Sequence, residues 1–320
     1  KKKVVSSLKE ISTACEYVYL ASDLDREGES IAWHLSKALN LKSEKIRRIR
    51  FSEITKKAIT TAVKNYDSIN MPLFHAQQAR RIIDRLLGYK ITPILWKEIQ
   101  NTATKDKSLS AGRVQSVVSK LIIDREKEIE KHNSQLYLKT TGSFNTKKGD
   151  IYGELDHNFT NEEEVNDFYN VCKEAIFKIE KVNMKRSYRN PSAPFITSTL
   201  QQECSNKWKM SPKQTMMVAQ KLYECGLITY MRTDSVTLSD DAVKMISEHI
   251  TNIYGDEYLN IKQYKNKSQN TQEAHEAIRP CVISTTSIDE DDCYDENEKR
   301  LYKLIWKRTI ASQMSTCKVN

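Results

Sequence analysis

Glycine is scarce in this sequence, with 8 glycines among 320 residues. Tight β-turns depend on glycine, because it adopts backbone angles that other residues avoid. A chain so poor in glycine therefore favours helices over closely turned sheets. Apolar residues that recur at helical spacing indicate where those helices lie. They predict helices over residues 55–64, 73–100, 110–131, 197–209, 212–225 and 240–253.

Strands and loops fill the intervals between these helices. Ser110 is the expected N-cap of the helix at 110–131, and Trp33 and Trp96 are expected in the core rather than stacked on a ligand. A chain of this length holds about two domains, and its patterns predict an α/β part followed by a mostly helical part. β-prone patches predict strands at 17–21, 46–51, 136–144 and 176–182. Polar stretches predict loops at 101–107 and 262–271. The acidic run 289–298 predicts a solvated helix start or a loop.

An acidic loop follows the first β-prone patch. Asp23, Asp25 and Glu27 alternate in SDLDREGE, so an extended chain would point the three carboxylates to one side. Such oxygen ligands favour Mg²⁺, which also bridges to phosphate oxygens. Gly28 gives the loop freedom to turn into the next helix. The alternative is a solvated acidic turn with Glu29 near a helix N-terminus.

A second informative segment is GLITYMRTDS, which places a tyrosine at a strand end or loop. Gly226 closes one helical pattern and Ser239 opens the next. A phenol has a pKa near ~10, so Tyr230 needs help to act as a nucleophile at neutral pH. Arg232 could stabilise a phenolate or hold a phosphate by a bidentate contact. A half-buried structural tyrosine is the alternative.

Several motifs occur in one order along the chain. They are SDLDREGESIAWHL at 22–35, RIRFSEITKKAI at 48–59, HAQQARRIIDRLLGY at 75–89, LSAGRVQSVVSKLIIDRE at 109–126, PFITSTLQQE at 194–203, TYMRTDS at 229–235 and HEAIRP at 275–280. Together they resemble the type IA DNA topoisomerases. TYMRTDS and HEAIRP are more similar to the topoisomerase I branch of that family than to the topoisomerase III branch.

The resemblance implies four parts. Residues 1–69 would be the later part of a TOPRIM α/β domain, 70–133 a helical domain that holds DNA, 134–189 part of a β-rich arch, and 190–316 a winged-helix-like domain with the active-site tyrosine. The family's earlier TOPRIM strand, with a glutamate and a nearby lysine, does not precede the acidic loop here, and the arch does not return before the last residue. We therefore expect a fragment of a longer protein.

The resemblance also implies roles for single residues. Tyr230 would attack a DNA phosphodiester, giving a 5′-phosphotyrosyl bond and a free 3′-OH without ATP, and Arg232 would stabilise the phosphate. Asp23, Asp25 and Glu27 would hold Mg²⁺. The candidate DNA contacts are Arg26, Arg48, Arg80, Arg81, Arg113, Gln77, Gln78, His275 and Arg279. For these arginines an ion pair within the protein or a surface position is the alternative, and for the histidine a structural role.

The composition agrees with a DNA partner. A net charge of +9 and a pI near 9.0 suit a polyanion. No apolar run approaches the ~20 residues that cross a bilayer. The resemblance implies a cytoplasmic, nucleoid-associated monomer that acts on a single-stranded DNA segment. The seven scattered cysteines suggest free thiols and no zinc site.

Two other functions stay open at this stage. One is an inactive, degenerate single-stranded DNA-binding module. The other is the topoisomerase part of a reverse gyrase, which would also need a P-loop; no GxxxxGK[ST] motif occurs in these 320 residues.

Overall fold

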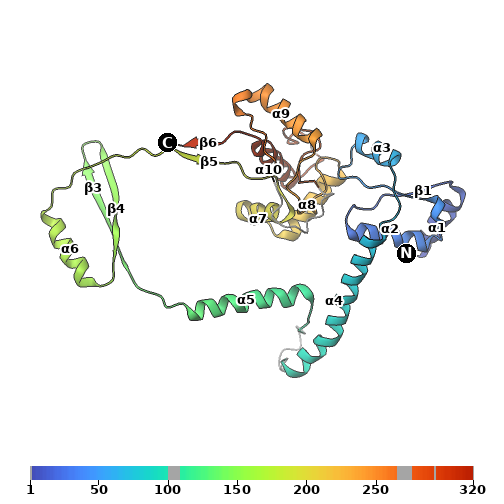
Figure 1. Cartoon of the computed structure of the whole chain (residues 1–320), viewed down its shortest axis with the longest axis horizontal. Helices are drawn as coiled ribbons and strands as arrows, with labels where there is room; N and C mark the ends of the chain where they lie inside the picture. The colour runs from blue at the N-terminus through green and yellow to red at the C-terminus, as the bar shows by residue number, and fades with distance from the viewer. Residues whose placement is uncertain (1, 100–108, 265–275, 292, 320) are drawn as a thin grey trace. The chain divides into compact units, whose positions relative to one another are not determined.

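The computed structural model describes residues 2–99, 109–264, 276–291 and 293–319. The chain divides into two compact units, Lys1–Arg81 with Lys185–Asn320, and Ile82–Met184. In chain order (Figure 1) the elements are α1 (Lys2–Ala14), β1 (Val18–Leu20), α2 (Arg26–Ala38), η1 (Ser43–Lys45), β2 (Ile46–Arg48), α3 (Lys56–Lys64), α4 (Met71–Glu98), α5 (Arg113–Lys131), β3 (Leu138–Thr146), β4 (Gly149–Phe159), α6 (Glu162–Glu174), β5 (Ser187–Arg189), α7 (Thr197–Trp208), α8 (Pro212–Glu224), α9 (Asp240–Tyr254), η2 (Asp256–Tyr258), α10 (Glu296–Ser312) and β6 (Cys317–Val319), where η marks a 3₁₀-helix.

The N-terminal part of the first unit is a βαβ arrangement. β1 and β2 pair in parallel, with Val18 opposite Ile46, and α2 connects them. Parallel strands need such a crossover connection. The side chain of Asp25 accepts the N–H of Gly28 at 2.8 Å and so caps α2. This cap satisfies one of the amides that the first helical turn leaves free. The arrangement places the acidic loop directly between a strand end and a helix start.

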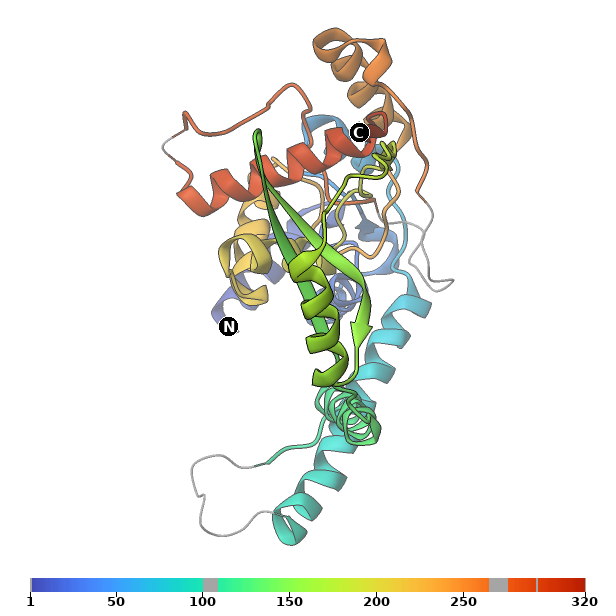
Figure 2. The ribbon, with the colours of Figure 1, turned by 90° about the vertical axis from the view of Figure 1, so that its left-hand side faces the viewer.

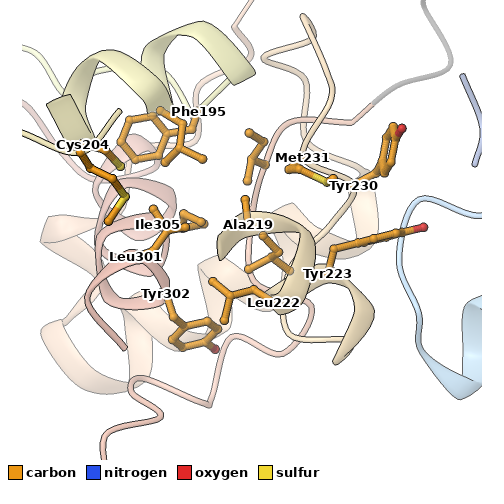
Figure 3. Close-up of a cluster of buried hydrophobic side chains, with 14 of the residues drawn as sticks. Phe195, Cys204, Ala219, Leu222, Tyr223, Tyr230, Met231, Leu301, Tyr302 and Ile305 are labelled. Atoms are coloured by element: carbon orange, nitrogen blue, oxygen red, sulfur yellow. The ribbon is translucent and has the colours of Figure 1, made fainter. Parts of the chain in front are cut away.

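The C-terminal part of the first unit is built on helices. At the start of α8, Ser211 and Gln214 satisfy each other's backbone amides in a capping box. Figure 3 shows Tyr223 and Tyr230 at one edge of the apolar cluster that these helices enclose, with their hydroxyl groups pointing away from its centre. The other buried members include Phe195, Leu200, Cys204, Leu222, Ile228, Met231, Ile278, Leu301, Tyr302 and Ile305.

The second unit contains an antiparallel hairpin of β3 and β4 with α6 beside it (Figure 2). The ring of Phe159 in β4 lies 5.4 Å from that of Phe168 in α6, centroid to centroid. The rings of Phe144 in β3 and Phe177 lie 4.8 Å apart. These aromatic contacts hold α6 and the segment after it against the hairpin.

The predicted helices form, with small shifts at their ends. One predicted cap is wrong: α5 begins at Arg113 after Gly112, so Ser110 is not its N-cap. The acidic run is a helix start preceded by a loop, as expected. Asp295 caps α10 in a capping box with Glu298.

Other predictions fail. Residues 176–182 form no strand among the described residues, and the apolar side chains of Ile176 and Ile179 are 86% and 70% exposed. Alternation alone does not make a strand, because the backbone needs a partner for its hydrogen bonds. Trp96 is 50% exposed and not in the core, whereas Trp33 is partly buried. We did not predict α1, α6, β4, β5 or β6, nor the part of α10 beyond the acidic run.

The predicted loop at 101–107 lies outside the described residues, and the loop at 262–271 lies partly outside them. Within the described ranges, none of the helices combines the length and the apolar character that a membrane crossing requires.

Candidate active site

The acidic loop between β1 and α2 is fixed from two sides. A Cβ on Gly28 would lie 2.0 Å from the carbonyl oxygen of Asp23, so the loop can lie this close to α2 only over a glycine. On the other side, the guanidinium of Arg48 donates hydrogen bonds to the carbonyl oxygens of Ser22 at 2.7 Å and Asp23 at 2.6 Å. The loop backbone is therefore fixed by its packing on Gly28 and by its hydrogen bonds to Arg48.

Arg48 is itself part of a buried ion pair. Its Nε lies 3.0 Å from Oε2 of Glu29, and both side chains are fully buried. The other carboxylate oxygen of Glu29 accepts the backbone N–H of Asn70 at 2.6 Å. The prediction of a phosphate contact for Arg48 is wrong in this structure, because its side chain does not reach the surface. The alternative, an ion pair within the protein, is what the structure shows.

The acidic loop meets the tyrosine segment at the hydroxyl of Tyr230. This hydroxyl donates to Oδ2 of Asp25 at 2.9 Å and lies 3.4 Å from Oδ2 of Asp23. The backbone N–H of Tyr230 donates to the carbonyl of Ser52 at 2.7 Å. Two motifs about two hundred positions apart in sequence are thus brought to one place.

The surroundings keep this tyrosine protonated. Burial, and next the Asp25 carboxylate, raise the pKa of Tyr230 far above its ordinary value, while Arg232 acts in the opposite direction. Burial, and next the Asp25 carboxylate, also raise the pKa of Asp23. The site is therefore short of positive charge, and a phenol that attacks from it must give its proton to a neighbour.

Arg232 lies beside the same carboxylates. Its Nη1 is 3.8 Å from Oδ2 of Asp25, and 55% of its side chain is exposed. This guanidinium can therefore face both the acidic loop and a ligand that arrives from solvent. A long ion pair of this kind leaves most of its donors for such a ligand.

Glu27 departs from the prediction that three carboxylates converge. Because α2 begins at Arg26, Glu27 lies in the first helical turn, where the alternation of an extended chain does not apply. Its carboxylate pairs with Arg26 at 3.6 Å and with Arg80 at 3.8 Å. Across the described ranges, no group of three or more His, Cys, Asp and Glu side chains could hold a metal ion. Asp23 and Asp25 converge as a pair.

The other predicted DNA contacts on α4 and α5 are partly or fully accessible. Arg81 is exposed, and Gln77 and Gln78 are partly buried. The side-chain amide of Gln78 donates to Gln77 at 2.9 Å. In the second unit, Arg113 makes a two-bond contact with Asp84, at 2.9 and 3.1 Å. These residues are accessible enough for a DNA contact, which stays a prediction.

Most of the HEAIRP motif that the structure describes is buried. His275 lies outside the described residues. Arg279 is buried, and its guanidinium contacts Glu276 at 2.7 and 2.9 Å and Glu53 at 3.1 Å. The prediction that Arg279 binds DNA is wrong in this structure, because two carboxylates take its donors inside the protein.

Three residues near the tyrosine were missed from the sequence. Ser52 and Glu53 belong to the RIRFSEITKKAI motif, but one serine and one glutamate in a strand-to-helix loop give no sign of their partners. Tyr223 packs edge-on against Tyr230 with ring centroids 5.3 Å apart. Burial raises the pKa of Tyr223 to about 12. The helical spacing of α8 could have placed Tyr223 on its buried face.

The geometry and the comparisons define the class of protein. Residues 1–54 match the Toprim domain model, and residues 68–320 match the DNA topoisomerase model. The chain belongs to the type IA DNA topoisomerase family, on the side of bacterial topoisomerase I.

One solved relative supports this assignment in detail. The chain is similar to full-length topoisomerase I from Thermotoga maritima, with 37% sequence identity and a TM-score of 0.78. The match covers 99% of this chain and 52% of that protein. The chain thus spans about half the length of the structure it matches.

Proposed function

We propose that this chain is the core of a type IA DNA topoisomerase that cuts one DNA strand, passes a strand and reseals the cut, relaxing negative supercoils without ATP. The observation that carries the proposal is the hydrogen bond of 2.9 Å between the hydroxyl of Tyr230 and Asp25. It joins the topoisomerase segment to the Toprim segment at a nucleophile. Family membership supports DNA as the substrate.

The chemistry follows from the charges around the phenol. The oxygen of Tyr230 forms a bond to phosphorus as the bond from phosphorus to the 3′-oxygen breaks, which leaves a 5′-phosphotyrosyl link and a 3′-OH. The phenolic proton goes to Asp25, which already accepts it in a hydrogen bond, and the leaving 3′-oxygen takes up a proton from a solvent water. Arg232 stabilises the charge on the phosphate. The phosphodiester energy stays in the new link, so resealing needs no ATP.

We propose Mg²⁺ as the cofactor, with Asp23 and Asp25 as its carboxylates and Glu27 as a further predicted contributor. The donor set fits, because Mg²⁺ binds through one or two carboxylates together with waters and phosphate oxygens. Burial, and next the Asp25 carboxylate, raise the pKa of Asp23, so a cation bound beside the pair would favour its charged form. When bound, the ion would offset this charge and help to position the DNA phosphate.

DNA would be held as a single strand by accessible cations and amides. Arg26 and Arg80 have side chains 39% and 37% exposed, and Arg81 is exposed. With Arg113 and the two glutamines of α4, they make the proposed contacts, to which His275 is added on the sequence motif alone. The net charge of +9 supports this binding. A monomer acting on DNA in the cytoplasm is part of the same proposal.

We also propose a finer division of the chain into domains. The segment 190–316 would form the winged-helix-like tyrosine domain, which the helices α7 to α10 support. The segment 134–189 would belong to the arch, and its hairpin of β3 and β4 supports this.

A labelled single strand tests the reaction. We expect the protein to become covalently linked to a fragment that carries a 3′-end label, because the tyrosine retains the 5′-phosphate. A 5′-end label should instead appear on a shorter free fragment that a polymerase can extend. A protein linked to the 5′-labelled piece would contradict the proposed polarity. Binding without any adduct would favour the inactive DNA-binding module.

A further inference from the structure

The backbone of the tyrosine segment lies directly against the loop that follows β2. The N–H of Tyr230 donates to the carbonyl of Ser52 at 2.7 Å. A Cβ on Gly226, whose φ is +72°, would lie 2.5 Å from the carbonyl oxygen of Ile54. A side chain is thus excluded at Gly226, where its backbone approaches that of Ile54. We call this contact the tyrosine seam.

Arg279 is fixed to the tyrosine side of the seam. The N–H of Thr229 donates to the carbonyl of Arg279 at 2.9 Å, and the N–H of Arg279 donates to Oγ1 of Thr229 at 3.0 Å. Next to them, Ile228 and Pro280 pair as an antiparallel bridge. Any shift of Arg279 is therefore transmitted to the residue that precedes Tyr230.

The side chain of Arg279 crosses the seam. Its Nη2 lies 3.1 Å from Oε2 of Glu53, the residue after the serine that binds the Tyr230 amide. The side chains of Arg279 and Glu53 are only 5% and 18% exposed. The other carboxylate oxygen of Glu53 accepts the hydroxyl of Thr55 at 3.0 Å, which orients it. Glu276, which also binds Arg279, belongs to the same segment as the arginine.

We propose that Glu53 is a positioning residue for the cleavage reaction: through Arg279 it holds the tyrosine seam closed and keeps the hydroxyl of Tyr230 against Asp25. This inference rests on the proposed role of Tyr230 as nucleophile. The two carboxylates on Arg279 lie on different sides of the seam. Glu276 neutralises the arginine from the tyrosine side and also accepts the N–H of Ser239 at 2.8 Å, whereas Glu53 reaches the arginine from the loop after β2.

This difference makes the proposal testable. Removing the charge of Glu53 leaves Arg279 paired with Glu276, so no buried charge loses its only partner and the fold should survive. The tyrosine segment would lose the ion pair between Arg279 and Glu53 that joins it to the loop after β2. A misplacement of about 1 Å can slow a reaction by as much as a hundredfold.

A matched control exists a few residues away. Lys57 of α3 pairs with Asp241 of α9. Like the Arg279–Glu53 pair, this ion pair joins the N-terminal and C-terminal parts of the first unit. Their side chains are 81% and 71% exposed, and a surface pair of this kind holds little in place. Asp241→Asn should therefore leave cleavage unchanged.

The experiment compares the wild-type protein with Glu53→Gln, Glu53→Asp and Asp241→Asn in the complete protein. We measure the initial rate of covalent adduct formation on saturating labelled single-stranded DNA, together with DNA affinity and thermal melting. We expect Glu53→Gln to slow adduct formation about tenfold, with affinity and melting as in the control. Glu53→Asp keeps the charge and should recover part of the rate.

Several results would overturn the inference. One is a wild-type rate for Glu53→Gln, and another is a rate loss that only parallels weaker binding or lower melting. If Glu53→Gln does not fold, Glu53→Asp decides, because a folded aspartate variant with the wild-type rate would exclude positioning by the longer side chain. A wild-type protein that forms no adduct would instead contradict the proposed function itself.

Discussion

At the scale of single residues, the site shifts the pKa of its ionisable groups away from their ordinary values. Burial, and next Asp25, raise the pKa of both the Tyr230 phenol and the Asp23 carboxyl. Arg232 is the cation that opposes this trend for both groups. A partly buried acidic pair beside a neutral nucleophile suits a reaction in which phosphate and a cation arrive together.

Gly28 is the residue on which the loop geometry depends most directly. In Gly28→Ala the new Cβ would lie 2.0 Å from the Asp23 carbonyl oxygen, so the loop must move. We expect a loss of about 1–3 kcal/mol in the free energy of unfolding, as for other overpacked sites, and slower cleavage. Gly88→Ala is the matched control: its nearest neighbour would be 3.7 Å away, and a helical alanine should stabilise by about 0.5–1 kcal/mol. Urea denaturation of both variants measures the difference, and equal stabilities would contradict the close contact.

At the scale of elements, the Arg48–Glu29 pair joins the βαβ arrangement. Arg48 ends β2, Glu29 lies in the first turn of α2, and Asn70 precedes α4. Arg48 also donates to the carbonyl of Leu20, the last residue of β1. One buried guanidinium therefore connects the two strands, the helix between them and the acidic loop.

Arg48→Met should destabilise the fold strongly. It leaves the buried carboxylate of Glu29 without its cation, which costs about 3–5 kcal/mol in comparable cases. The control is Arg26→Met, since this side chain is 39% exposed and its ion pair is long, at 3.6 Å. Thermal or urea unfolding of the two variants makes the comparison. If Arg48→Met were as stable as the control, the pair would not anchor the loop.

The sequence was most informative about elements with local signals. The start of α9 follows from Ser239, whose side chain accepts the amide of Ala242. The segment 176–182 failed because alternation does not reveal whether a partner strand exists. The hairpin strand β4 lacks a strong apolar alternation, since almost all of it is exposed, and so it gave no signal.

The candidate site was predictable to the extent that its chemistry lies in short motifs. Asp23, Asp25 and Tyr230 do come together. Arg48 and Arg279 could not be separated from surface arginines, because burial and ion-pair partners depend on tertiary contacts far along the chain. The same reason explains why Glu53 was missed.

At the scale of the whole molecule, the site exists only when distant parts of the chain have folded together. The two residues of the central hydrogen bond are separated by 205 positions. A contact between residues so far apart carries the entropy cost of closing a long loop. The site therefore depends on the first unit as a whole, while the basic charge of the chain concerns its affinity for DNA.

The most direct test of the nucleophile is Tyr230→Phe. Phenylalanine keeps the ring that packs against Tyr223 and removes only the attacking oxygen. Labelled single-stranded DNA is incubated with wild-type and variant protein, the reaction is stopped with denaturant, and covalent adducts are separated on a denaturing gel, with binding measured in parallel. We expect the wild-type protein to form an adduct and the variant to form none while binding the strand about as well. An adduct at the wild-type level in Tyr230→Phe would show that another residue attacks the phosphate, and would contradict the central claim.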